Sequence, residues 1–179
     1  MVAIDGKTVR HRLDRDSGKA AIHMVSAWVQ ANRLVLGQEQ VSEQSNEMTA
    51  IPKRLARLAI TGAVVTLDAM ECQQVLAKQI IEQQGDDVLS LQGNHGELHD
   101  DVSRYFASQP ELDCSTHVDS GHGRIETRIV RVGREIEWLK ERHPEWTSLN
   151  SIVAVTARRE TKQSTQEATR YFISSLPHH

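Results

Sequence analysis

Two aspartates that are far apart in the chain each follow a strand-like run. Asp5 comes after the apolar residues 2–4, and Asp68 comes after the run AVVTL at 63–67. Function gathers at the carboxyl ends of neighbouring strands, so the two carboxylates would share a small space if these strands are neighbours. Close carboxylates repel each other, and a divalent ion such as Mg²⁺ binds such hard oxygen ligands. The pattern therefore indicates metal-assisted phosphoryl transfer. The alternative is that Asp68 only caps the next helix.

The elements around these aspartates predict an α/β protein. Two strand-like runs joined by an Asn-containing link predict a hairpin over 22–41, and the run 45–60 after it predicts a helix. A buried strand, a helix ending at Gly85 and another strand follow. A further helix is expected from Asn94 to Phe106. After about residue 110 the runs 125–132, 151–159 and 168–176 read as strands around a short helix. We expect residues 1–109 to form the first part of a core. Residues 110–179 would form a β-rich insertion and return strand of the same domain.

Composition places the chain among ordinary soluble proteins. Hydrophobic residues make up 39% and charged residues 25% of the 179 residues. No apolar run is long enough to span a membrane and no apolar signal region opens the chain, so we expect a cytoplasmic protein. Cys72 and Cys114 form neither a zinc pattern nor a disulfide framework. The net charge of −3 argues weakly against a nucleic-acid binder, but Arg and Lys outnumber Glu within 124–142.

Five motifs, in order, resemble one family. They are VAIDGKTVR, LGQEQVSEQSNE, VTLDAMECQ, DDVLSLQGNHGEL and GHGRIETR. Together they resemble the DDE-type transposases of bacterial insertion sequences, in the branch associated with H-repeat elements. The resemblance runs from Val2 to Leu176. Each motif alone is weak, whereas five in this order with compatible gaps are specific.

This resemblance implies a ribonuclease-H-like mixed sheet flanked by helices, with a strand-rich insertion in the second half. The family holds Mg²⁺ or Mn²⁺ with two aspartates and one glutamate. It hydrolyses a phosphodiester bond at the end of the element and joins the freed 3′-hydroxyl to target DNA. Asp5 in IDGK and Asp68 in LDAMECQ match the two aspartates. The implied partners are DNA, as element ends and as target, and further copies of the chain in a homo-oligomer.

The third acid of the family is not matched. It lies in a motif with His, Trp and Ile-Glu-Asn, and no such motif occurs before the final SSLPHH. The family also places Lys at the position of Gln44, and Lys and Gln around GN, where Gln92 and His95 stand here. We therefore expect a transposase catalytic-domain fragment with impaired or absent activity, because losing a ligand weakens metal retention and positioning.

Three further residues are candidates for the site. Glu47 could face the metal, although an acid in a first helical turn commonly offsets the helix dipole. Asn94 could contact a DNA phosphate, and its alternative role is a helix N-cap with Glu97 as capping-box partner. Lys7, in the IDGK motif, is a candidate DNA contact.

The motif GHGRIETR supplies a possible DNA-facing patch. His122 precedes Arg124, Glu126 and Arg128, which share one face of a strand. A solvated charge ladder is the simpler reading of this alternation, and the resemblance favours a DNA contact.

Two other classes remain open. The chain could be a non-catalytic DNA-binding or oligomerising remnant. It could also be a different metal nuclease of the same fold whose last acid is Glu160 or Glu167.

Overall fold

The chain is described by a computed structural model. Its described residues are 2–9, 22–29, 34–41, 51–53, 55–68, 72–121 and 123–177, the first three ranges as backbone alone. The chain divides into two compact units, Met1–Val88 and Leu89–His179. The boundary that we expect near residue 110 stays a prediction. No helix within these ranges combines the length and apolarity needed to cross a membrane.

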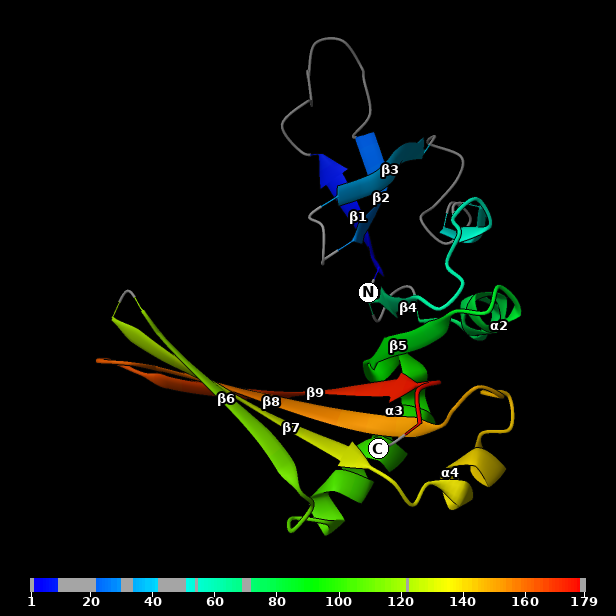
Figure 1. The fold of residues 1–179 in the computed structure, drawn as a ribbon. Coiled ribbons are helices and arrows are strands. Elements are labelled where there is room, and N and C mark those ends of the chain that lie inside the picture. Colours follow the sequence, from blue (N-terminus) through cyan, green and yellow to red (C-terminus); the bar gives the residue numbers. More distant parts are fainter. Residues whose placement is uncertain are drawn as a thin grey trace. The chain divides into compact units, whose positions relative to one another are not determined.

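The first unit holds a mixed sheet. Its strands, in the order β3-β2-β1-β4-β5, are β3 (Leu34–Val41), β2 (Ile22–Val29), β1 (Val2–Val9), β4 (Val64–Leu67) and β5 (Asp86–Leu91), which crosses into the second unit. Strand β2 is antiparallel to both β1 and β3, whereas β1 and β4 are parallel. Figure 1 shows β1, β2 and β3 side by side. The predicted hairpin over 22–41 and the predicted mixed sheet are confirmed.

Helix α2 (Gln74–Glu82) connects β4 to β5 and buries Leu76, Ala77 and Ile80. The sequence also predicts Val75 on the inward face, which is wrong because 67% of this residue is exposed. After the helix, Gln84 adopts the left-handed conformation, with φ of 60°. Gly85 is needed for a different reason. A Cβ there would lie 3.1 Å from the Ile60 carbonyl oxygen, so any side chain at this position would push against the neighbouring backbone.

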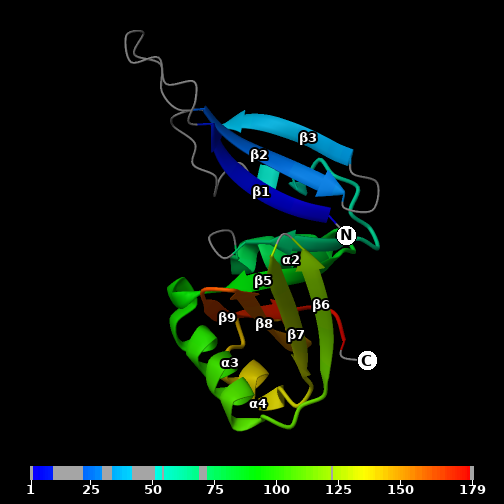
Figure 2. The ribbon, with the colours of Figure 1, turned by 90° about the vertical axis from the view of Figure 1, so that its left-hand side faces the viewer.

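The second unit contains a four-stranded antiparallel ribbon in the order β9-β8-β7-β6. Its elements are the 3₁₀ turn η2 (Gly93–His95), α3 (Gly96–Ser108), β6 (Cys114–Gly121), β7 (Arg124–Gly133), α4 (Glu137–Arg142), β8 (Ser151–Thr161) and β9 (Thr165–Ser174). The strand-rich second half is therefore confirmed, but β6 was not predicted. Figure 2 shows the four strands from the side, with α3 along them.

The core of the second unit lies where α3 packs on one end of the ribbon. Leu98, Val102 and Phe106, four residues apart as predicted, are buried on α3. The Phe106 ring stacks on Tyr171 of β9 with a centroid distance of 6.1 Å. The other end of the ribbon extends beyond α3 and α4 (Figure 1), and all eight residues of β6 are exposed.

Candidate metal site and nucleic-acid interface

The pairing of β1 with β4 brings the two predicted acid positions to neighbouring places in the sheet. The strands run parallel, and Ile4 pairs with Leu67. Asp5 follows Ile4 within β1 and Asp68 follows the last residue of β4, so a pairing continued by one residue would put their Cα atoms about 5 Å apart. The condition for a shared site, that these two strands are neighbours, is therefore met.

The sequence suggested that Asp5 stands at the end of its strand, and this is wrong. Strand β1 continues to Val9 and pairs with β2 along its whole length, with Asp5 opposite Ser26. The strand that ends is β4, whose last residue is Leu67. The acid pair therefore lies where β4 stops beside a continuing β1.

Asp68 is exposed and does not cap the following helix. Helix α2 begins at Gln74, its N-cap is Gln73, and no side chain caps it. The capping alternative for Asp68 is therefore wrong. The described side chains, which do not include that of Asp5, contain no group of three or more His, Cys, Asp or Glu that could hold a metal ion. Any metal site at Asp68 needs ligands from residues whose side chains lie outside the described set.

Cys72 is a buried thiol in the same unit. Only 4% of the residue is exposed, and it precedes α2 instead of lying on it. Burial, reinforced by the negative charge of Asp87, raises the pKa of the Cys72 thiol to about 12. This thiol therefore stays protonated at neutral pH, and neither nucleophilic chemistry nor metal binding is expected from it.

The structure describes some of the remaining candidate residues and not others. Asn94 lies exposed within η2, and the N-cap of α3 is His95, so the predicted capping box with Glu97 is wrong. Instead, Gln92 and His95 cap the 3₁₀ turn reciprocally, and the Gln92 N–H donates to His95 Nδ1 at 3.3 Å. Lys7 lies on β1 opposite Met24. Glu47 and His122 lie outside the described residues.

Arg124 and Arg128 are joined through one carboxylate, that of Glu126. Arg124 Nε lies 3.0 Å from Glu126 Oε1, and Arg128 Nη2 lies 3.3 Å from Glu126 Oε2. The predicted common face of these three residues is therefore confirmed. Both arginine side chains remain about half exposed, whereas that of Glu126 is 25% exposed. The carboxylate holds two outward-facing guanidinium groups apart by bonding to both.

The same face carries further arginines from the next two strands. Arg159 of β8 lies directly opposite Glu126. Arg170 of β9 lies opposite Val155, which in turn lies opposite Val130 of β7. Because alternate residues of a strand share a face, Arg124, Arg128, Arg159 and Arg170 lie on one side of the ribbon. We call this the arginine face; Glu126 and Asp119 are its two acids.

The opposite face of the ribbon is nearly neutral in charge. Arg158 donates to Glu160 at 2.9 Å and lies opposite Glu167 on β9. The exposed Val118 and Ile125 belong to the same face because they pair with Thr127 and Ser120 across the β6–β7 ladder. The ribbon therefore separates four arginines on one side from an exposed apolar and neutral side.

The sequence reasoning missed an ionic network in the second unit. Asp101 of α3 is buried, and its Oδ2 lies 2.9 Å from His143 Nε2 and 2.8 Å from Arg142 Nε. Its Oδ1 lies 3.4 Å from Arg104 Nη1. Glu145 lies 3.5 Å from His143 Nδ1. The sequence feature that could have indicated this network is the position of Asp101, a charged residue, on the apolar face of α3. This network ties α3 to the end of α4.

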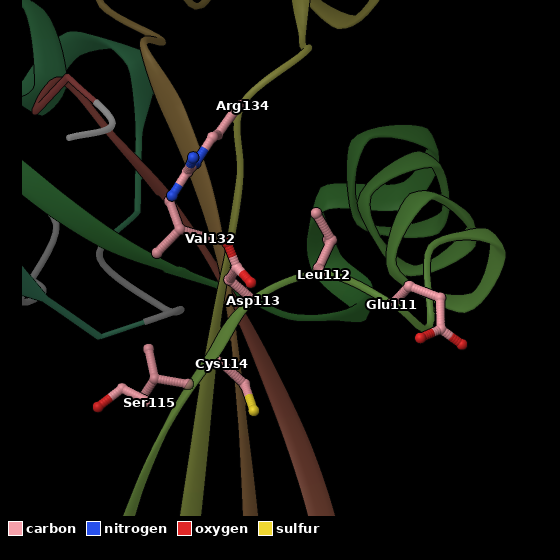
Figure 3. A pocket seen from close by; sticks show the side chains of 8 residues that line it. Glu111, Leu112, Asp113, Cys114, Ser115, Val132 and Arg134 are labelled. Atoms are coloured by element: carbon pink, nitrogen blue, oxygen red, sulfur yellow. The ribbon is translucent and has the colours of Figure 1, made fainter.

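A hollow of about 410 Å³ lies at the base of β6 and is lined by Glu111, Leu112, Asp113, Cys114, Ser115, Val130, Val132 and Arg134. Figure 3 shows that the side chains of Glu111, Cys114 and Ser115 point in different directions. Groups that do not converge on one point cannot act together on a substrate. We therefore assign no chemistry to this hollow.

The mixed sheet, its strand order and the neighbouring acid positions define a ribonuclease-H-like α/β protein. The sequence model of the transposase DDE domain matches residues 1–171. An uncharacterized protein from the dhlA 3′ region of Xanthobacter autotrophicus is 41% identical over 177 residues, which are 97% of this chain and 59% of that protein. The chain belongs to the transposase DDE domain family, and the resemblance inferred from the five motifs is confirmed.

A second relative is the H repeat-associated protein YhhI of Escherichia coli K12, which is named as a candidate transposase. It is 38% identical over 183 residues, which cover 98% of this chain and 48% of that protein. The chain thus spans about half the length of these curated relatives. Among solved structures, a chain of a piggyBac transposase synaptic complex with hairpin DNA aligns with a TM-score of 0.48 and 11% identity, over 99% of this chain and 33% of that one.

Proposed function

We propose that this chain supplies two metal-binding carboxylates, Asp5 and Asp68, to a DNA transposase. The observation that supports the proposal is the parallel pairing of β1 with β4, because Asp5 and Asp68 are the residues that follow the Ile4–Leu67 pair. Members of this family use divalent metal ions. The donor set fits Mg²⁺ or Mn²⁺ because both ions accept carboxylate oxygens as ligands.

Each carboxylate has a simple electrostatic role. Two carboxylates at neighbouring positions would repel each other, and a divalent ion held between them would offset that repulsion. When bound, such ions activate a nucleophile and stabilise the leaving oxygen of a phosphodiester. Asp5 and Asp68 would hold the ion in a fixed place, and the sheet that carries β1 and β4 would keep the two acids from moving apart.

The family resemblance assigns a third acid to a motif that these 179 residues do not contain. We therefore propose that a polypeptide of this sequence alone has little strand-transfer activity, because the ion lacks one ligand that positions it. A strand-transfer assay with Mg²⁺ and duplex ends measures this directly. Robust metal-dependent product would contradict the proposal.

DNA is the proposed partner, and the arginine face is its proposed contact. Arg124 and Arg128 are held outward by Glu126, and surface ion pairs of this kind contribute at most about 1 kcal/mol, so phosphates can replace the carboxylate at small cost. Guanidinium groups bind phosphate through paired hydrogen bonds. The proposed contact is to the phosphate backbone, which positions DNA without reading its sequence.

Titration calorimetry with Mn²⁺ tests the metal site. We expect Asp5→Asn and Asp68→Asn each to weaken binding by roughly tenfold or more, because each removes a charged ligand. The double variant should bind little more weakly than either single one, since both residues would hold the same ion. Asp100→Asn is the control, because its exposed side chain belongs to the second unit. Fully additive losses, or no loss, would refute a shared site.

The alternative is a non-catalytic DNA-binding protein that pairs with other copies. It is favoured by the arginine face, which needs no metal. The same variants discriminate the two functions. If Asp5→Asn and Asp68→Asn leave both Mn²⁺ and DNA binding unchanged, the non-catalytic function stands and the metal site does not.

A further inference from the structure

Strand β6 (Cys114–Gly121) is the last strand of the ribbon. It pairs with β7 on one side and ends the strand order on the other. An edge strand presents a row of backbone N–H and C=O groups that can pair with another strand. Proteins commonly protect such edges with Lys or Pro, and the β6 sequence CSTHVDSG contains neither. All eight residues are exposed.

The charges of β6 are poorly matched within its own chain. His117 lies directly opposite Arg128, and Asp119 lies directly opposite Glu126. Two carboxylates at directly opposed positions, as Asp119 and Glu126 are, destabilise a strand pair. In the part of the chain that the structure describes, the side chains of His117 and Asp119 form neither a hydrogen bond nor an ion pair. A strand on the outer side of β6 can offer these two side chains better-matched partners than β7 does.

The order of residues on β6 makes this strand complementary to itself. We propose that two copies of the chain pair through β6, antiparallel about a twofold axis that passes beside Val118. In this register each His117 lies opposite Asp119 of the second copy. Thr116 lies opposite Ser120 of the second copy, and the two Val118 residues face each other. Opposite-charge, hydroxyl and β-branched cross-strand pairs are all favourable.

Neighbouring registers are disfavoured by charge. A twofold axis perpendicular to the sheet leaves the same face of both copies on the same side of the joined sheet. The residue beside the axis then pairs with the same residue of the second copy. An axis at His117 would oppose the two histidines, and an axis at Asp119 would oppose two carboxylates. Only the axis at Val118 places both acids against both histidines. The charges therefore specify this register against those two.

The apolar side chains of β6 and β7 support the same pairing. Val118 is 58% exposed and Ile125 is 46% exposed. They are diagonal neighbours on the neutral face. In the proposed dimer, Val118 of the second copy would cover Val118 and reduce the exposed apolar area. The arginine faces of both copies would lie on the same side of one continuous sheet.

Cysteine cross-linking tests the dimer without DNA or metal, so its outcome is independent of the proposed metal site. In a Cys114→Ser background, Val118→Cys should form a disulfide-linked dimer under mild oxidation. Opposed Cα atoms are about 4.5–5.5 Å apart, within the range that a disulfide spans. Ile125→Cys is the control, because it is similarly exposed but would lie three strand spacings across the sheet and four residues along it from its equivalent, about 20 Å in all. Equal cross-linking of the two variants, or none at position 118, would overturn the proposal.

A second pair of cysteines tests the register. Thr116→Cys and Ser120→Cys chains should each stay uncross-linked alone, and a mixture of the two should give a disulfide-linked heterodimer. Cross-linking of either variant with itself, or none in the mixture, would contradict the axis at Val118.

Sedimentation velocity with His117→Asp gives a measurement without cysteines. Within the chain this change places a carboxylate opposite Arg128, which is favourable and should preserve the fold. Across the axis it opposes Asp119 of the second copy with a like charge. We expect the dimer dissociation constant to rise roughly tenfold or more, since two such contacts are created. An unchanged constant, or a wild-type chain that remains monomeric at every concentration, would refute the dimer.

Discussion

The arginine face makes a quantitative prediction about salt. Replacing Arg124 and Arg128 with Ala removes two half-exposed cations that Glu126 holds outward. Each phosphate neutralised on duplex DNA contributes about −0.9 to the slope of log K against log salt. If both arginines contact phosphates, the slope of the double variant should therefore be less steep than that of the wild type by about 1.8.

This slope translates into an affinity difference that depends on salt. Between about 50 mM and about 200 mM salt, a slope difference of about 1.8 changes the affinity ratio of the two proteins by about 12-fold. The wild type should bind much more tightly at the lower salt, and the two proteins should converge at the higher salt. Fluorescence anisotropy of a labelled duplex over a salt series measures both slopes directly.

Arg158→Ala is the matched control for this experiment. Arg158 lies on the same ribbon, is similarly exposed and pairs with Glu160 two residues along, as Arg124 does with Glu126. Its side chain belongs to the opposite face. We expect its slope to match that of the wild type. The reasoning fails if Arg158→Ala reduces the slope as much as the double variant does, or if the double variant keeps the wild-type slope.

Three further predictions concern packing and ionisation. Gly133→Ala should lower the free energy of unfolding by about 1–3 kcal/mol in urea titrations, because its Cβ would lie 2.5 Å from a β8 side chain and 2.7 Å from an α3 side chain. Asp101→Asn should cost roughly 3 kcal/mol by the same measurement, since it removes the buried carboxylate to which His143 and Arg142 bond. At pH 8.5 a maleimide should label the exposed Cys114 rapidly and Cys72 only on unfolding, because a thiol with a pKa of about 12 carries almost no thiolate.

Each of these predictions has a control or a contradicting result. Gly121→Ala should be nearly neutral, since nothing lies within 4 Å of the added Cβ. A fully stable Asp101→Asn protein would show that the network is not needed for packing. For Cys72, the raised pKa means that the folded protein retains a proton that the unfolded chain loses near its ordinary thiol pKa of about 8.5. The free energy of unfolding should therefore fall as the pH rises from about 8.5 towards 12, and a Cys72→Ala variant should lack this component.

The strands that were predicted share a strong local signal. The strand at 64–67 and those at 151–161 and 165–174 contain β-branched or aromatic runs that read as strands without any tertiary information. Strand β6 lacks this signal. Its eight residues are exposed, with Val118 as the one large apolar side chain, so no buried face imposes an alternation. It becomes a strand because β7 pairs with it.

The site was predictable in part for a similar reason. Strand-like runs before Asp5 and Asp68 indicated where the acids lie, and five motifs indicated the family. Register is a long-range property, so only the paired strands show that Ile4 meets Leu67 and that β1 continues past Asp5. The Asp101–His143 contact joins residues 42 positions apart, and local patterns carry no information about it.

The exposed end of the ribbon has a consequence for how such proteins diversify. Its side chains are not buried in a core, and surface substitutions of this kind typically change the free energy of unfolding by no more than about 0.5 kcal/mol. Arginines and acids can therefore be exchanged there during evolution without loss of the native state. The sequences of the outer strands can drift in this way while the ribbon keeps its fold.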